Sequence, residues 1–227
     1  MSKDALRITK LAIPFVAAGL VLGAIILVVG TTTALNVKAY VKPNAYNFLT
    51  RDSWIVYHGA KGTFGVGGGC KHGSGVIPGV PYWGHLEYID HGIGLNVHAT
   101  SITAYIFQDI GVDFDPQTGK PVGARIICGT ARTDMFGDAS FAVRAQDLGE
   151  PGVNDNFDIR VTSSDGSTVF YDTTNECRWH FLGSTAPCAA GNGGGGNIQL
   201  HKPNPSTTGS FGGSCPAMFV PPPAGIS

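Results

Sequence analysis

Short runs in which apolar and polar residues alternate recur along most of this chain, and they constrain its fold more than any other feature. Ala139–Gln146 alternates in this way, and so do Leu95–Thr100 and Phe157–Thr162. Because successive side chains of a strand point to opposite faces, a period of two predicts half-buried β-strands. No stretch after residue 34 keeps a helical period over a useful length. The predicted fold is therefore all-β, an antiparallel β-sandwich or barrel-like domain.

Turn-forming residues separate these runs, as expected between short strands. Arg125–Thr133 and Ala139–Gln146 are predicted to form a hairpin around Asp134–Asp138. Glycine dominates from Gly62 to Pro81, so that stretch is predicted to be a loop or an irregular edge. The other predicted strands are His85–His91, Leu95–Thr100, Ile102–Phe107, Phe157–Thr162, Val169–Tyr171, Arg178–Phe181 and Asn197–His201, and Leu35–Lys42 is a candidate first strand.

The composition agrees with a folded β domain. The 227 residues include 33 glycines and 14 prolines, and charged residues make up 14%, against about 25% in an average globular chain. The hydrophobic content of 43% argues against a disordered chain. The net charge of −1 and the lack of a polybasic run argue against nucleic acid as a partner.

The N-terminus predicts delivery to, or anchoring in, a membrane. Residues 11–30 carry no charge, and Lys3, Arg7 and Lys10 precede them. Twenty apolar or small residues can span a bilayer as a helix, with the basic end in the cytoplasm. A cleaved secretory signal has the same layout, with weak cleavage candidates after Ala34 and Ala39. Both alternatives place the rest of the chain outside the cytoplasm, extracellular or at the cell surface.

Four segments follow from these patterns. Residues 1–34 are a signal peptide or signal-anchor helix, 35–61 a linker or first strand, 62–202 the β domain, and 203–227 a Pro/Gly-rich tail. The predicted partners are the membrane, through the N-terminal segment, and either further copies of the chain or a surface polymer.

The five cysteines show no C-x-x-C spacing, and outside the cytoplasm they favour disulfides over a metal site. Cys128 follows the apolar alternation of its strand, so it is predicted to be a buried free thiol. The four others lie in Gly/Pro-rich stretches, which allows three pairings. Cys177–Cys188 is preferred because a short connection closes easily, and Cys70–Cys215 follows by elimination.

An acidic stretch is the strongest candidate for a metal site. Asp147, Glu150, Asn154 and Asp155 lie within nine residues, and calcium binds six to eight oxygens, often from one loop. The spacing does not match an EF-hand. A structural turn explains the same residues, because Pro151-Gly152 suits the centre of a type II turn. Calcium is accordingly the cofactor that this stretch suggests.

A histidine-rich strand offers a second pattern. His85 and Glu87 are two residues apart, and His91, His98 or His201 could join them around zinc. The exposed polar face of a half-buried strand explains this pattern more simply.

No enzyme motif is present, so no catalytic residue is assigned. The chain lacks G-x-S-x-G, H-E-x-x-H and P-loop sequences. Residues 191–196 satisfy G-x-G-x-x-G, but a predicted strand follows them instead of the helix that dinucleotide binding requires.

Several segments, in order, resemble the post-COAP domain, a bacterial extracellular β domain of unsettled function. They are Gly84–His91, Val97–Thr103, Ala124–Thr133, Asp147–Ile159 with its Gly-Glu-Pro-Gly loop, and the closing strand Gly195–Lys202. The resemblance covers roughly 62–202 and implies a secreted β domain. The cysteine-bearing stretch 177–188 and the N-terminal hydrophobic segment depart from it.

Two functions are consistent with these features. The first is a non-enzymatic extracellular or cell-surface module that is structural, adhesive or self-associating. The alternative is a calcium-dependent enzyme or carbohydrate-binding protein acting on an extracellular polymer, in which Trp54, Trp83 and Trp179 stack on sugars.

Overall fold

The computed structural model describes residues 47–71, 82–108, 115, 118–186, 188–189, 196–202 and 211–216. All of them belong to one compact unit, Asn44–Ser227. The predicted N-terminal hydrophobic segment and the candidate strand Leu35–Lys42 lie outside the described residues. Within the described ranges, no helix is long and apolar enough to cross a membrane.

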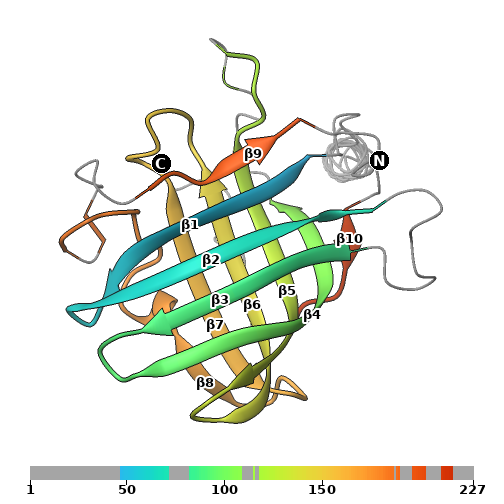
Figure 1. The fold of residues 1–227 in the computed structure, drawn as a ribbon, viewed down its shortest axis with the longest axis vertical. Helices are drawn as coiled ribbons and strands as arrows, with labels where there is room; N and C mark the ends of the chain where they lie inside the picture. Colours follow the sequence, from blue (N-terminus) through green and yellow to red (C-terminus); the bar gives the residue numbers. More distant parts are fainter. Residues whose placement is uncertain are drawn as a thin grey trace, which may run out of the picture. The chain divides into compact units, whose positions relative to one another are not determined.

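The described residues form one antiparallel sheet, which confirms the all-β prediction. The strand order is β8-β7-β6-β5-β4-β3-β2-β1-β9, and β10 adds to β4 (Figure 1). Neighbours in the sheet are mostly neighbours in sequence, as in a meander. The strands are β1 (Phe48–Tyr57), β2 (Ala60–Cys70), β3 (Tyr82–Asp90), β4 (Leu95–Gln108), β5 (Gly123–Thr133), β6 (Gly137–Asp147), β7 (Asn156–Ser163), β8 (Val169–Asp172), β9 (Gln199–His201) and β10 (Gly212–Gly213); a short 3-10 helix, η1, spans Thr173–Asn175.

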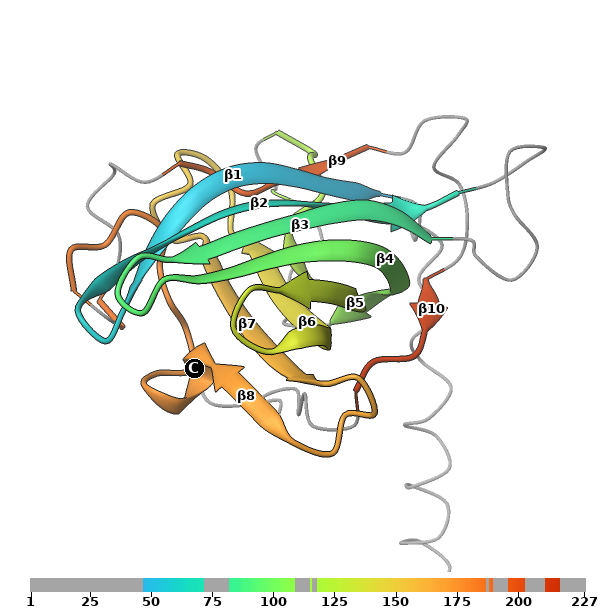
Figure 2. The same ribbon diagram turned by 60° about the horizontal axis from the view of Figure 1, so that its bottom comes forward.

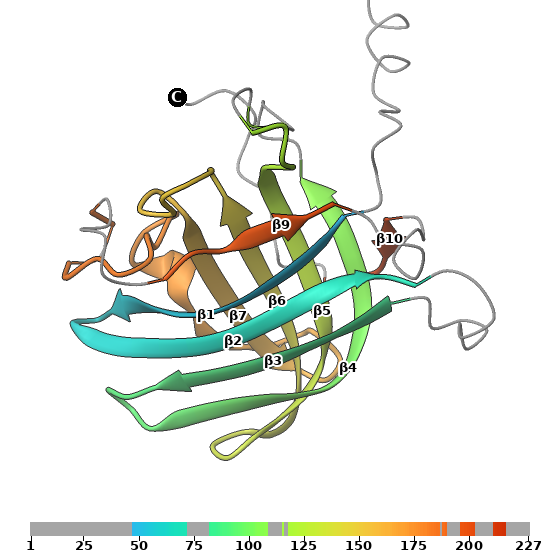
Figure 3. The same ribbon diagram turned by 45° about the horizontal axis from the view of Figure 1, so that its top comes forward.

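The sheet bends sharply along β4, so that its two halves face each other (Figures 2 and 3). β3 pairs with β4 only through Leu95–His98. Two register shifts follow, between Ala99 and Ser101 and between Ile102 and Ala104, and such bulges increase strand bend and twist. β10 then pairs with Ala104 and Tyr105 of β4. The result is sandwich-like, with β1–β3 and β9 over β5–β8.

The main core lies between these two halves. The ring of Phe64 on β2 stacks on Phe157 of β7 with centroids 3.7 Å apart. Tyr88 on β3 and Tyr171 on β8 share a buried hydrogen bond of 2.6 Å between their hydroxyls. These contacts join strands that are distant in sequence, so burial of apolar surface holds the bent sheet closed.

The predicted hairpin of β5 and β6 is confirmed, but both of its faces are buried. Phe141 and Val143 point into the main core. Ile126, Cys128 and Ala142 form a second, smaller cluster on the other face. The alternation identified the strands correctly. It did not predict that the polar residues at alternate positions, including Arg144, would also be buried, because that burial depends on tertiary packing.

The cysteine prediction is half right. Cys177–Cys188 forms a disulfide as expected. Cys128 pairs with Cys215, however, and Cys70 is the buried free cysteine. The correction has a structural cause: β10 lies against β4 next to the strand that carries Cys128, and Cys215 follows β10 directly.

The glycine-rich stretch from Gly62 is a strand, which corrects the loop prediction for residues 62–70. A Cβ at Gly68 would lie 2.8 Å from Ile127 and 3.2 Å from Tyr105 of the facing layer. Glycine is therefore needed here for close packing of the layers, and it does not mark a loop.

Two other boundaries also differ from expectation. Arg178–Phe181 contributes only a single bridge, between Asn156 and Phe181. The sheet extends beyond 62–202 at both ends, because β1 precedes this range and β10 follows it.

Candidate functional site

The acidic loop, residues 147–155, connects β6 to β7. Its turn is closed by the N–H of Gly152, which donates to the carbonyl of Gly149 at 2.9 Å. The Glu150–Pro151 peptide is cis, and Gly152 has φ +76°, in the left-handed region that favours glycine. The chain therefore turns at these residues.

Two buried aspartates bind backbone N–H groups on both sides of this loop. Asp147 accepts from Gly149 and from Leu200 of β9, both at 2.8 Å. Asp155 accepts from Leu148 at 2.7 Å and from Ile198 at 2.8 Å. Each carboxylate thus holds its own loop with one oxygen and the β9 segment with the other.

Glu150 adds a third link between the same two segments. Both of its carboxylate oxygens accept from the side-chain amide of Asn197, at 3.0 and 2.8 Å. All six carboxylate oxygens of the acidic loop are therefore hydrogen-bonded within the protein. The loop fastens the β9 segment to the opposite layer of the sheet.

Burial dominates the electrostatics of this loop. It raises the pKa of Asp155 to about 8, although the backbone N–H groups of Leu148 and Ile198 act in the opposite direction. Burial also raises the pKa of Asp147.

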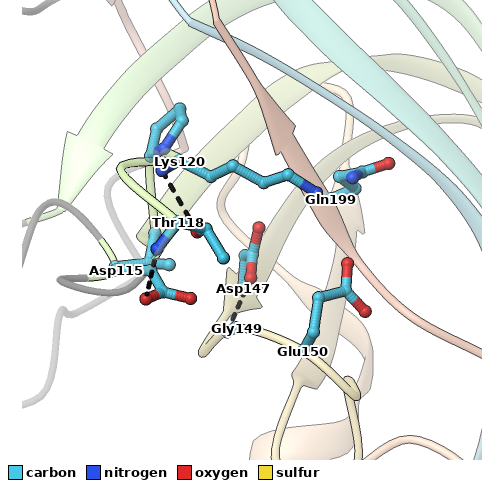
Figure 4. Close-up of a pocket in the computed structure, with 9 residues that line it drawn as sticks. Asp115, Thr118, Lys120, Asp147, Gly149, Glu150 and Gln199 are labelled. Carbon is cyan, nitrogen blue, oxygen red and sulfur yellow. Dashed lines mark hydrogen bonds between the residues drawn. The ribbon is translucent and has the colours of Figure 1, made fainter.

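A small pocket opens beside the acidic loop (Figure 4). In this view Lys120 extends toward Gln199, and Asp147 and Glu150 lie below it. The cavity has a volume of about 10 Å³, near the minimum that holds one water molecule. Asp115, Thr118, Pro121, Val122 and Gly149 complete the lining.

The four residues predicted to bind calcium differ in exposure. Asp147 and Asp155 are buried, whereas Glu150 and Asn154 are exposed. Within the part of the chain that the structure describes, no group of three or more His, Cys, Asp or Glu side chains could hold a metal ion. The calcium site stays a prediction, and a fastening role explains the three carboxylates with the contacts observed.

The histidine-rich strand does not gather its residues around one point. Glu87 contacts His98 across β3 and β4. His91 instead contacts the hydroxyl of Thr63 at 2.9 Å, and His85 lies over Gly67 of β2. The pattern is therefore the exposed polar face of a sheet.

That face carries an open pocket, here called the outer pocket, which sequence reasoning missed. It has a volume of about 490 Å³ and is lined by Thr50, Arg51, Asp52 and His85. The carboxylate of Asp52 and the imidazole of His85 both lie within 4.0 Å of where a Cβ at Gly65 would be. A missing side chain on β2 thus lets two polar groups from β1 and β3 approach each other.

Aromatic rings lie close to Thr50, one of the residues that line the outer pocket. Phe48 stacks on His201 with centroids 4.6 Å apart, and its ring centroid lies 5.9 Å from that of Trp83. Thr50 contacts the His201 ring at 2.8 Å. The alternate glycines Gly65, Gly67 and Gly69 were the available sequence signal, because a period of two among glycines indicates one bare strand face.

Comparison with known proteins adds no relative: no protein-family model, curated protein or solved structure matches this chain. The resemblance to the post-COAP domain therefore stays a prediction.

Proposed function

We propose that this chain is a non-enzymatic extracellular module whose outer pocket binds a polyhydroxylated ligand, the carbohydrate of a surface polymer. The observation that carries the proposal is the outer pocket itself, an open space lined by hydroxyl, carboxylate, guanidinium and imidazole groups. Thr50 in its lining contacts His201, whose ring belongs to a group of stacked aromatic rings. The hydroxyls of a sugar can form hydrogen bonds with the polar groups, and its apolar ring face can stack on the aromatic rings.

The compartment supports this proposal. Two disulfides indicate an oxidising environment, which is typical of extracellular proteins. The predicted signal or anchor segment and the resemblance to an extracellular β domain point the same way. An adhesive module needs a fixed shape, and the acidic loop and the Cys128–Cys215 disulfide serve that need.

The test is binding of soluble extracellular polysaccharides to the full-length chain, kept in detergent throughout and measured by calorimetry. Asp52→Ala and His85→Ala are each expected to weaken binding about tenfold or more, which corresponds to about 1.4 kcal/mol. Gly65→Val should also weaken binding because it fills the pocket floor, where it displaces the flexible end of Asp52.

Asp138→Ala is the matched control. Its side chain is 83% exposed at the far hairpin, so binding should be unchanged. Binding that survives all three pocket substitutions, or wild-type protein that binds no polysaccharide in the panel, would rule out the outer pocket as the site. Concentration-dependent association without polysaccharide binding would favour the self-associating alternative.

A further inference from the structure

The Cys177–Cys188 disulfide lies beside a buried histidine that the fold holds in a fixed orientation. The sulfur of Cys177 is 3.3 Å from Nε2 of His180. On the other side of the ring, Nδ1 of His180 is 2.9 Å from Oδ1 of Asp158. The exposed fraction is 1% for His180 and 0% for Asp158. Sulfur, imidazole and carboxylate thus form a line, as in sites where a base serves a nucleophile and is itself oriented by an acid.

Other contacts fix this line in place. Arg144, 2% exposed, forms a buried ion pair with Asp158. The ring of Tyr57 packs edge-on against that of His180, with centroids 5.9 Å apart. Because Asp158 accepts a hydrogen bond from Nδ1–H of His180, Nε2 is the ring atom left to face the sulfur. Glu176 also approaches Nε2, at 3.6 Å.

The two sulfurs of this disulfide differ in access. Cys188 is exposed, whereas Cys177 is half-buried against His180. Cys188 also has φ +61°, a left-handed conformation that is uncommon for a residue other than glycine. An incoming thiol therefore reaches Cys188 first, and the sulfur it releases is the one beside the imidazole.

We propose that Cys177–Cys188 is a thiol–disulfide exchange site. The sulfur of Cys188 is attacked, and the sulfur of Cys177 is the leaving group that His180 stabilises. The partner is a thiol, either a small molecule or an exposed protein cysteine.

The exchange balances without another reagent. An incoming thiolate attacks the sulfur of Cys188, a new S–S bond forms there, and the S–S bond to Cys177 breaks. Cys177 leaves with the electron pair as a thiolate. His180 donates an N–H to this thiolate when Nε2 carries a proton taken up from solvent in addition to the proton on Nδ1. Attack by a second thiol on the mixed disulfide releases Cys188 as a thiolate and oxidises the two incoming thiols to their disulfide. Exchange is faster when the leaving thiolate is stabilised.

The other cysteines serve as internal references. Cys128 is fully buried in an apolar cluster and bonded to Cys215. Cys70 is free, but burial raises its pKa to about 12, which keeps it a protonated and unreactive thiol.

The experiment treats the full-length oxidised chain with glutathione, quenches samples by alkylation, and maps each cysteine by mass spectrometry. Glutathione is expected on Cys188, and Cys177–Cys188 should open about tenfold or more faster than Cys128–Cys215. His180→Asn keeps a side-chain donor for Asp158 but removes the group beside the sulfur, and it should slow opening about tenfold.

Three results would overturn the proposal: glutathione on Cys177 instead of Cys188, equal opening of the two disulfides, or a wild-type rate in His180→Asn. The first two are read on the wild-type chain, so the proposal stays falsifiable even if His180→Asn fails to fold. Far-ultraviolet circular dichroism and a thermal melt verify that variant first.

Discussion

At the scale of single residues, buried carboxylates carry much of the specificity of this fold. Asp147 and Asp155 would be costly to bury without partners. Each accepts one hydrogen bond from its own loop and one from the β9 segment. Their geometry depends on two segments more than forty residues apart, so neither residue alone predicts its role.

The raised pKa of Asp155 gives a pH dependence with a defined sign. In the unfolded chain this carboxyl titrates near its ordinary pKa of about 3.9, and in the folded chain near about 8. Between these values the folded state binds more protons, so the free energy of unfolding falls as pH rises from about 4 to about 8, by at most about 1.4 kcal/mol per pH unit.

Urea unfolding at a series of pH values checks this prediction. Asp155→Asn is expected to be less stable than wild type, because its amide cannot accept both backbone N–H bonds. It should nevertheless show a flatter dependence on pH, with a residual slope of the same sign from Asp147, whose pKa burial also raises. A pH dependence of wild type that equals that of Asp155→Asn would contradict the assignment.

At the scale of elements, the acidic loop is a fastener between β6, β7 and β9. Its hydrogen bonds reach Ile198 and Leu200, which enter the main core at the edge of the sheet. An edge strand as short as β9 pairs with β1 through only three residues. The side-chain hydrogen bonds of the acidic loop add to this pairing and hold β9 in place.

This role predicts that calcium does not change the stability of the protein. Thermal melts of the full-length chain in chelator and in millimolar calcium should coincide. Glu150→Gln should cost about 1 kcal/mol in both conditions, because it weakens the exposed pair with Asn197. A cation that binds only the folded state would instead stabilise wild type by about 2.7 kcal/mol at a hundredfold excess over Kd. Such a gain in wild type, absent from Glu150→Gln, would establish the cation site.

At the scale of the whole domain, side chains close a sheet whose two ends do not pair as strands. The hydroxyl of Tyr171 on β8 donates to Asp90 of β3 at 2.8 Å. The hydroxyl of Tyr57 on β1 donates to the carbonyl of Asp172 at 3.0 Å. On the opposite edge the acidic loop holds β9. Closure therefore rests on buried polar contacts in addition to the apolar core.

The two disulfides are predicted to contribute unequally to global stability. Cys128–Cys215 closes a loop with a sequence separation of 87, against 11 for Cys177–Cys188. Loop-closure entropy gives about 3 kcal/mol for a loop of 15 residues and about 4.7 kcal/mol for one of 100. Replacing both members of a pair by alanine should thus cost more for Cys128 with Cys215. Denaturant midpoints of the two double variants measure the difference, and equal or reversed losses would contradict it.

The sequence by itself determined the strands from β3 to β9, but not β1, β2 or β10. Alternation in Ala139–Gln146 and Phe157–Thr162 indicated β6 and β7, and the hairpin joining β5 to β6 followed from its turn residues. The short sequence separation of Cys177 and Cys188 also predicted their disulfide. These features are local, since strand periodicity, turn chemistry and short loop closure depend on residues a few positions apart.

Only the tertiary structure decided which faces and segments meet. The sequence predicts a buried free thiol at Cys128, but β10 places Cys215 beside it and the two form a disulfide. The glycine-rich sequence around Gly68 predicts a loop, yet Gly68 lies within a strand. Ile127 from the facing layer occupies the space that a side chain at this position would need. The acidic loop and the line from Cys177 to Asp158 likewise join segments that lie apart in sequence. Contacts of that range leave no periodic mark on the sequence.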